Sequence, residues 1–221
     1  MLDYAQARRL MVDCQLRTFD VTDIALLDAF DAVPRERFMP ADRQDFAYID
    51  QPQAVGTEDG ETRFMPAPMV LARLIQALQP GAEDRALVVA SGRGYGAALL
   101  ARLVKSVVAV ESDPALASAA DQTVKALGLG NVTHHVGKCE DGAAAAGPYD
   151  IVLIEGAVRQ IPQSLIDQIA EGGRLATVLC GIGGVQGAAR LMVKEGGVTS
   201  GRPLFDARSE ERRVGKECRS R

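Results

Sequence analysis

Apolar residues in the first third of the chain recur at the three- and four-residue spacing that is typical of amphipathic helices. The pattern covers DYAQARRLMVDCQLR and VTDIALLDAF, where Thr22 is the expected N-cap, and it returns in PMVLARLIQAL from Pro68. Residues 51–62, QPQAVGTEDGET, are polar and contain Gly and Pro, so we expect an exposed loop there. Residues 1–80 are therefore predicted to form a largely helical extension.

From residue 85 the pattern changes to short apolar runs that alternate with helical segments. The predicted strands cover residues 86–90, 106–111, 132–136, 151–155 and 174–180. The predicted helices between them cover about residues 95–103, 114–127 and 162–170. Such alternation predicts a mostly parallel sheet that helices cover on both faces. Sheets of this kind bind ligands beyond the carboxyl ends of their strands.

The end of the fold differs from its middle. In ARLMVKEGGVTSGRPLFD, Gly196-Gly197 joins two strand-like runs and predicts an antiparallel hairpin with a two-residue turn. A parallel α/β sheet closed by such a hairpin is the Rossmann-like layout associated with S-adenosylmethionine-dependent methyltransferases. We therefore predict a single domain over residues 1–208, with a helical acceptor-side extension (1–80) and a cofactor-binding α/β core (81–208).

Composition favours one cytoplasmic globular domain. The chain has 221 residues, of which 47% are hydrophobic and 24% are charged, enough for a sizeable core. Its four cysteines form no CxxC pair, and its N-terminus carries charge where a signal peptide has an apolar core. No apolar run approaches the roughly 18 to 20 residues that span a bilayer, so we expect no membrane partner. The net charge of −4 gives no support to a nucleic-acid partner.

The last stretch, SEERRVGKECRSR over residues 209–221, is almost devoid of apolar residues. It contains five Lys or Arg and three Glu, so it lacks the surface that a segment must bury in order to fold. We interpret it as a disordered or non-native tail in preference to a basic anchoring segment.

The segment LVVASGRGYGAAL is typical of a buried strand that turns tightly into a helix beside a ligand. Its glycine spacing is G-x-G-x-G, whereas a dinucleotide-binding turn has G-x-G-x-x-G. Ser91, Gly92, Gly94 and Tyr95 are the candidates for contact with the methionine portion of the donor. A glycine-rich turn without a ligand is the alternative.

A candidate acidic partner ends the next strand, in VVAVESD. Glu111 follows the glycine turn by about twenty residues. This is the sequence spacing at which a carboxylate on the next strand can accept hydrogen bonds from both ribose hydroxyls, and Ser112 lies beside it. A solvated acid at a strand end is the alternative interpretation. Glu140, in GKCEDG after the third strand, is a candidate for the adenine edge, although an ordinary polar turn explains the segment equally well.

We expect no metal site. The neighbouring His134 and His135 lie in a predicted strand, where successive side chains face opposite sides, and no spaced Cys, His or Asp partners accompany them. Cys139 is interpreted as a small apolar core residue.

Several motifs in their order along the chain resemble one enzyme family. These are VPRERFMP, AYIDQPQAVG, GETRFMPAPMV, ASGRGYGAALLARL, VVAVESD, GPYDIVLIEGA and IAEGGRLATVL. Together they resemble protein-L-isoaspartate O-methyltransferases over nearly all of residues 7–207. The resemblance implies S-adenosylmethionine as the donor and the free α-carboxylate of L-isoaspartyl residues in damaged proteins as the acceptor. It leaves the oligomeric state open.

The chemistry that the resemblance implies requires little acid–base machinery. A carboxylate, with a reference pKa near 4, is already ionised at neutral pH, so no side chain has to remove a proton before attack. The protein has to orient the two reactants and supply a fixed electrostatic environment.

The chain departs from the family at two places. Val88 and Ala90 stand where the family usually has an acid and a glycine, and Ala90 adds a Cβ where positive φ is expected. The family's G-Q-T-I-S-x-P segment appears as GETRFMP: Thr62 remains, the active-site serine is absent and Arg63 is new.

We predict that Thr62 and Arg63 are the catalytic residues beside the acceptor carboxylate. Arg63 is either a fork that holds that carboxylate or an ordinary surface arginine. Glu155, which ends the fourth predicted strand, binds the amine of the donor's methionine or faces water. Two alternatives remain: a methyltransferase of a different small acceptor, and a non-catalytic scaffold that retains the fold. A nicotinamide enzyme is disfavoured by the glycine spacing.

Overall fold

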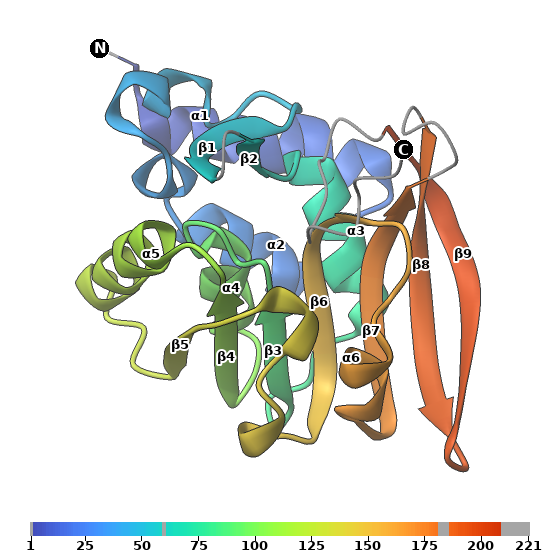
Figure 1. The fold of residues 1–221 in the computed structure, drawn as a ribbon. Coiled ribbons are helices and arrows are strands. Elements are labelled where there is room, and N and C mark those ends of the chain that lie inside the picture. Colours follow the sequence, from blue (N-terminus) through green and yellow to red (C-terminus); the bar gives the residue numbers. More distant parts are fainter. Residues whose placement is uncertain (1, 59–60, 181–185, 209–221) are drawn as a thin grey trace.

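The computed structural model describes residues 2–58, 61–180 and 186–208. At its centre is a seven-stranded sheet in the order β5-β4-β3-β6-β7-β8-β9 (Figure 1). The strands are β3 (Arg85–Val89), β4 (Ser106–Glu111), β5 (Val132–Val136), β6 (Tyr149–Val158), β7 (Ile169–Cys180), β8 (Gln186–Glu195) and β9 (Val198–Arg208). The strands from β3 to β7 are parallel, and β8 and β9 are antiparallel additions. The predicted α/β methyltransferase-type fold is confirmed.

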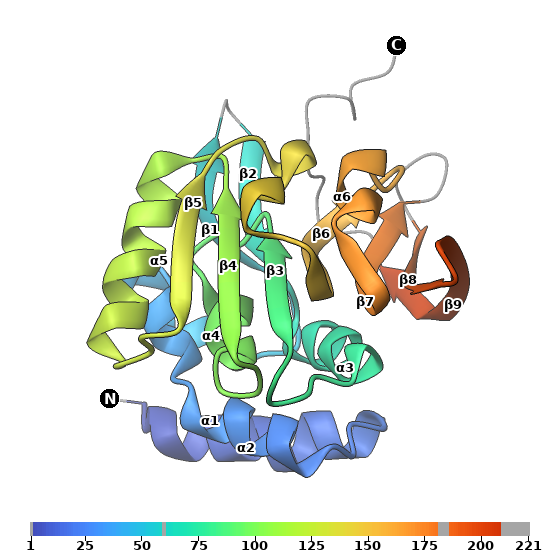
Figure 2. The same cartoon turned by 90° about the horizontal axis from the view of Figure 1, so that it is seen from below.

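Helices cover both faces of the sheet. They are α1 (Tyr4–Met11), α2 (Ile24–Ala32), α3 (Pro68–Leu78), α4 (Tyr95–Leu100), α5 (Pro114–Ala126) and α6 (Gln163–Asp167). A π-helical turn (Val12–Leu16) and short 3₁₀ turns (Arg17–Phe19, Arg35–Phe38, Ala41–Phe46, Cys139–Asp141, Ala144–Ala146) complete the helical content of the described residues. Figure 2 shows α3 and α4 against one face with α1 and α2 outside them, and α6 on the other face.

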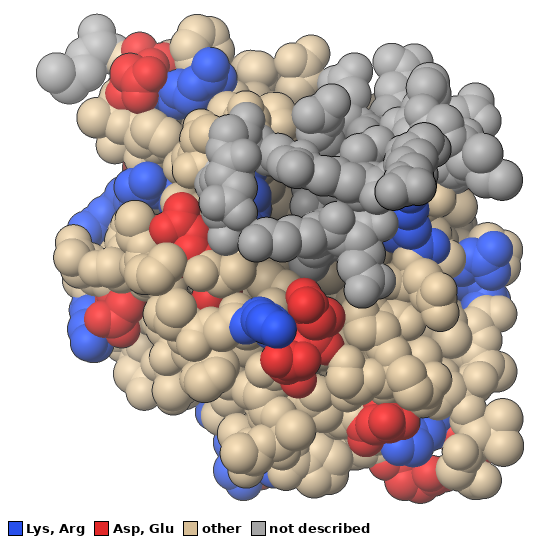
Figure 3. Space-filling model, viewed as in Figure 1, with Lys and Arg blue, Asp and Glu red and all other residues tan. Residues whose placement is uncertain are grey.

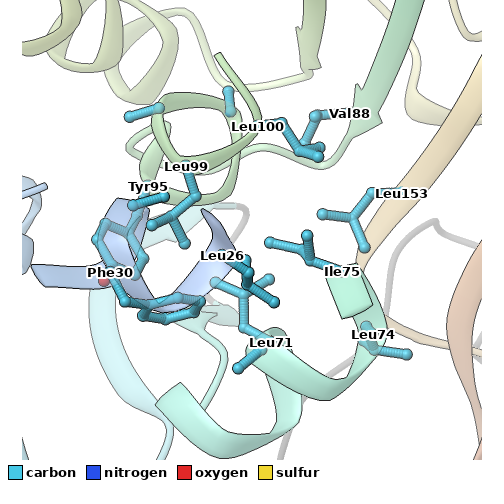
Figure 4. Packing of buried hydrophobic residues seen from close by; sticks show 14 of the residues in the cluster. Leu26, Phe30, Leu71, Leu74, Ile75, Val88, Tyr95, Leu99, Leu100 and Leu153 are labelled. Carbon is cyan, nitrogen blue, oxygen red and sulfur yellow. The ribbon is translucent and has the colours of Figure 1, made fainter. Parts of the chain in front are cut away.

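The two faces of the sheet have separate cores because successive residues of a strand point to opposite sides. Val88 and Leu153 point to the face that α3 and α4 cover. Leu87 and Val89 point to the opposite face and belong to the core under α6. Figure 4 shows Leu26 and Phe30 of α2 beside Leu71 and Ile75 of α3, and Tyr95 beside Leu99 of α4. The N-terminal helices therefore share one core with the sheet, and a division at residue 80 stays a prediction.

A hairpin replaces the loop expected over residues 51–62. Strand β1 (Gln53–Glu58) pairs antiparallel with β2 (Glu61–Met65), above the carboxyl ends of β3 and β4 (Figure 1). The exposed-loop prediction was wrong because this mostly polar segment contains two buried residues, Gln53 and Val55, that anchor it to the rest of the fold. The hairpin brings the GETRFMP motif over the edge of the sheet where ligands bind.

Two predictions about the ends of helices differ from the structure. Asp23, and not Thr22, caps α2: its carboxylate accepts a hydrogen bond from the Leu26 amide at 3.0 Å. The helix predicted over residues 162–170 ends at Asp167, and β7 begins at Ile169. The Gly196-Gly197 turn is confirmed, with φ of 59° and 75° at its two residues.

The surface of the described residues carries both signs of charge. Figure 3 shows basic and acidic side chains interspersed over the face that it presents. Among the described residues no helix is both long and apolar enough to cross a membrane. The predicted tail, residues 209–221, lies outside the described residues.

Candidate cofactor and acceptor site

The turn between β3 and α4 depends on left-handed backbone conformations. Ala90, Gly92 and Gly94 have φ of 57°, 54° and 88°, so three residues of the turn lie in the region that favours glycine. The Gly94 amide donates to the Ser91 carbonyl at 2.8 Å, and the Ser91 amide donates to the Val110 carbonyl of β4 at 3.1 Å. These bonds fix the turn at the carboxyl ends of β3 and β4.

Glycine is required at two points of this turn for different reasons. A Cβ at Gly94 would lie 2.9 Å from the Cβ of Ala120, so α5 packs too closely for any side chain. Among the residues that the structure describes, a Cβ at Gly92 would meet only Val55, 4.0 Å away, so Gly92 is needed for its conformation.

Glu111 ends β4 and is fully buried. Its Oε2 accepts from the Gly92 amide at 2.6 Å. Its Oε1 accepts from the amides of Ser112 at 2.9 Å and Asp113 at 3.1 Å, and from the Ser112 hydroxyl at 3.2 Å. The structure thus brings together Gly92, Glu111 and Ser112, as the spacing of the motifs predicts. A carboxylate that accepts several hydrogen bonds from fixed backbone amides is held in one orientation.

Arg63 reaches this carboxylate from the hairpin. Its Nη2 lies 3.0 Å from Glu111 Oε2, and its Nη1 donates to the Ser112 hydroxyl at 3.3 Å. The Arg63 side chain is only 15% exposed, so it is not an ordinary surface arginine. Thr62 precedes it in the same strand, where neighbouring side chains face opposite ways, so the structure does not bring both predicted catalytic residues to one face.

Tyr95 is placed away from the other candidates. Its ring is buried in the helical core, 5.4 Å from Phe38 and 6.0 Å from Phe30 between ring centroids (Figure 4). Its side chain therefore does not join Gly92 and Glu111, because the first turn of α4 directs it toward α2. Burial raises the pKa of the Tyr95 hydroxyl, so the residue stays neutral.

The buried Arg35 is a further residue of the site that no local sequence pattern predicts. Its Nε donates to the Ala47 carbonyl at 2.8 Å and its Nη2 donates to the Pro66 carbonyl at 2.6 Å, while its Cζ lies 4.8 Å from the Tyr95 ring centroid. Burial lowers the pKa of Arg35, and Tyr95 and Glu155 oppose that shift. Because Ala47 and Pro66 flank the β1–β2 hairpin, Arg35 holds both ends of the segment that carries Arg63. Its only signal in the sequence is the VPRERFMP motif.

The two remaining acids lie in different environments. Glu155 is buried on β6, and its Oε1 would lie 2.2 Å from a Cβ built on Gly96, so it packs on the first turn of α4. The Glu140 side chain is exposed, and its carbonyl accepts a hydrogen bond from the Ser164 hydroxyl. Cys139, beside Glu140, is buried, and burial together with the charge of Glu111 raises the pKa of its thiol.

The residues present fit a nucleoside-bearing ligand. The Glu111 carboxylate, at the edge of two parallel strands, suits the hydroxyls of a ribose, which donate hydrogen bonds. The buried Ser91 hydroxyl beside Gly92 has no hydrogen-bond partner among the described residues, which is unusual unless a ligand supplies one. Within the described ranges, no three His, Cys, Asp or Glu side chains form a group that could hold a metal.

The sheet with its antiparallel β8 and β9, the glycine turn and the acid that ends β4 define an α/β methyltransferase of the S-adenosylmethionine-dependent class. A family model described as protein-L-isoaspartate(D-aspartate) O-methyltransferase matches residues 6–203. The chain belongs to this family.

Individual relatives agree with this assignment. Protein-L-isoaspartate O-methyltransferase of Roseiflexus sp. (strain RS-1) is 36% identical over 90% of this chain and 87% of its own length. The enzyme of the same name from Methylorubrum extorquens (strain PA1) is 40% identical over 78% of this chain and 74% of its own.

Two solved structures share the fold. A protein-L-isoaspartate O-methyltransferase has a TM-score of 0.81 and 25% identity over 91% of this chain, which spans 64% of that protein's length. A putative enzyme of this kind from Plasmodium falciparum, in complex with S-adenosyl-L-homocysteine, has a TM-score of 0.73 and 19% identity, covering 94% of this chain and 96% of its own.

Proposed function

We propose that the chain transfers the methyl group of S-adenosylmethionine to the free α-carboxylate of L-isoaspartyl residues in damaged proteins. The observation that carries this proposal is the contact between Gly92 and Glu111 at the edge of the sheet, with Arg63 beside it, in a chain of this family. The partners are isoaspartyl proteins and peptides, and the place of action is the cytoplasm.

The donor-binding residues are proposed from their positions. Glu111 and Ser112 hold the ribose, and Ser91, Gly92 and Gly94 adjoin the methionine portion. Glu155 and Glu140 face the methionine amine and the adenine edge. Tyr95 contributes through its backbone, since its ring lies in the core. When bound, S-adenosylmethionine supplies an electrophilic methyl group on a positively charged sulfur.

The protein contributes orientation to the reaction. Glu111 accepts hydrogen bonds from the ribose hydroxyls, and the planar guanidinium of Arg63 holds the acceptor carboxylate. One carboxylate oxygen bonds to the methyl carbon while the carbon–sulfur bond breaks and its electron pair stays on sulfur. No general base is required because the acceptor is already ionised at neutral pH. In the ester product the backbone amide nitrogen of the following residue then attacks the ester carbonyl and methanol leaves, which closes a succinimide and begins repair.

A second candidate is a methyltransferase of a different small acid. It is favoured by the GETRFMP segment, in which Phe64 stands where the resemblance places a serine and Arg63 supplies a carboxylate fork. A free carboxylic acid would use the same guanidinium.

The test is methyl transfer from labelled donor to an L-isoaspartyl peptide, with the same peptide carrying aspartate as the matched control and a panel of small acids in parallel. We expect labelling of the isoaspartyl peptide and none of the aspartyl control. Labelling of small acids alone contradicts the proposed acceptor and supports the second candidate.

A further inference from the structure

Gln168 lies between α6 and β7, and its buried side chain bonds to the turn that follows β5, residues 137–143. This turn contains Glu140, which the proposed function places at the adenine edge of the methyl donor. We propose that Gln168 is a positioning residue for adenine recognition: it fixes the 137–143 turn, and the fixed turn presents its polar groups to the base. The inference rests on the proposed function and adds a residue outside the set assigned to the methyl donor.

The side-chain amide of Gln168 is bonded at both of its polar atoms. Its Oε1 accepts from the Ala143 amide at 2.9 Å, and its Nε2 donates to the carbonyls of Asp141 at 2.9 Å and Ser164 at 2.8 Å. The oxygen and the nitrogen of this amide are distinguished because each faces backbone groups of the opposite kind. Gln168 therefore holds the turn by its backbone, as a neighbouring strand would.

Gly142 makes this close approach possible. Its φ is 62°, and a Cβ built there would lie 2.7 Å from Gln168 Oε1 and 2.7 Å from Leu165 Cδ2. A side chain at position 142 is thus excluded by the conformation and by the distance to α6. The Ser164 hydroxyl adds a hydrogen bond to the Glu140 carbonyl. Every residue from 140 to 143 is therefore in contact with α6 or with Gln168.

The beginning of the turn lies beside the proposed ribose site. The Gly137 amide donates to the Glu111 carbonyl at 3.1 Å. Cys139 is buried in the same core as Ala90 of the glycine turn. The 137–143 turn thus runs from the acid assigned to the ribose to Gln168. Since a base is attached to its ribose, this turn adjoins the adenine when Glu111 holds the ribose.

The carboxylate of Glu111 is fixed by other elements. Its oxygens accept from the amides of Gly92, Ser112 and Asp113, which follow β3 and β4. Loss of the Gln168 bonds therefore shifts the 137–143 turn and leaves the ribose contacts in place. A purely structural role of Gln168 would instead lower the stability of the fold, or the affinity for every part of the ligand. The base is thus the part of the ligand that reports on Gln168.

The test compares two ligands that differ only in the base, S-adenosylhomocysteine and S-inosylhomocysteine, by calorimetry. Adenine has an amino donor and a ring-nitrogen acceptor where hypoxanthine has an oxo acceptor and a protonated ring nitrogen. A site that recognises the adenine edge therefore leaves its polar groups unpaired when hypoxanthine binds. We expect the unmodified protein to prefer S-adenosylhomocysteine by about tenfold or more.

Gln168→Met keeps a side chain of similar length and removes its hydrogen bonds. We expect it to lose at least about threefold of the preference through weaker binding of S-adenosylhomocysteine, while the affinity for S-inosylhomocysteine changes by less than about twofold. The matched control is Gln163→Met, an exposed glutamine of α6, which should keep the full preference. Ser164→Ala removes only the hydroxyl on the Glu140 carbonyl and should show a smaller loss in the same direction. Thermal unfolding shows which variants are folded.

Three results overturn the positioning role. These are an unchanged preference in folded Gln168→Met, an equal loss of affinity for both ligands, and an unmodified protein without any preference. If Gln168→Met does not fold, an unchanged preference in Ser164→Ala overturns it.

Methylation of the L-isoaspartyl peptide tests the proposed function separately. If the peptide is methylated but Gln168→Met keeps the full preference, the positioning role is wrong and the proposed function stands. If the preference falls as expected but no isoaspartyl peptide is methylated, the proposed acceptor is wrong and the positioning role stands.

Discussion

Nη2 of Arg63 lies 3.0 Å from Oε2 of Glu111, although 48 residues separate the two in the sequence. Arg63 comes from the β1–β2 hairpin and Glu111 from the end of β4, so the ion pair joins the proposed acceptor side to the proposed donor side. The Gly92 amide donates to the same carboxylate oxygen. A substitution of Arg63 therefore alters the surroundings of the proposed donor site, and a substitution of Glu111 alters those of the proposed acceptor site.

Gly96→Ala tests how closely Glu155 packs on α4. The new Cβ would lie 2.2 Å from Glu155 Oε1, and this carboxylate is buried, so either it or the helix must move. We expect a loss of about 1–3 kcal/mol in the free energy of unfolding, measured by urea denaturation. Gly130→Ala is the control, since a Cβ there meets no atom of the described residues within 4 Å. Equal stability of the two variants contradicts the packing described.

Ala90→Gly tests the left-handed conformation of the turn. Relief of the positive φ at position 90 raises the free energy of unfolding by about 1 kcal/mol, and loss of a buried methyl group lowers it by about 0.8 kcal/mol. We therefore expect the stability to change by less than about 0.5 kcal/mol. Ala109→Gly, on the buried β4 with ordinary φ, loses its methyl without relief and should cost about 1 kcal/mol or more. Equal losses in thermal or urea unfolding contradict the strained turn.

Arg35→Ala tests the anchoring of the hairpin. It leaves the buried carbonyls of Ala47 and Pro66 without their donor and opens space under Tyr95, so we expect a loss of at least about 2 kcal/mol. Arg35→Lys should recover only part of the stability that Arg35→Ala loses, because a single ammonium group lacks the planar guanidinium that reaches both carbonyls. The exposed Arg37 offers a matched Arg→Ala control, which should be near neutral in urea denaturation. A near-neutral Arg35→Ala is the contrary result.

His134 gives a pH dependence of stability. Burial lowers the pKa of its imidazole below the unfolded value of 6.5, against the opposing charge of Asp121. The unfolded state therefore binds the proton first, and stability falls as the pH drops below about 6.5 toward the folded pKa. We expect His134→Asn to remove part of this fall in urea denaturations between pH 7.5 and 5. The exposed neighbour provides the control His135→Asn, which should leave the slope nearly unchanged. An unaltered slope in His134→Asn contradicts the burial argument.

The sequence predicted the sheet better than the site. Strands β4 and β5 have the predicted limits because their apolar and β-branched runs end at polar turn residues. The hairpin was missed because polar residues dominate it, although Asp59-Gly60 between two short runs is a known hairpin signal. The capping of α2 was assigned one residue too early, since Thr22 and Asp23 are both good N-caps.

The partners of the site residues depend on tertiary packing that no local pattern records. The spacing of Gly92 and Glu111 predicted their proximity because both follow adjacent parallel strands. The ion pair of Arg63 could not be predicted, because it depends on where the hairpin rests over the sheet. The direction of Tyr95 likewise follows from the packing of α2 on α4.

The most direct test of the account is calorimetric titration of S-adenosylhomocysteine into the unmodified protein and into Glu111→Gln, with thermal unfolding to show that both are folded. We predict binding by the unmodified protein and affinity weaker by about tenfold or more in Glu111→Gln, because an amide accepts ribose hydroxyls at only one atom and without charge. Equal affinity in two folded proteins would contradict the assignment of Glu111 to the ribose, and with it the position of the donor.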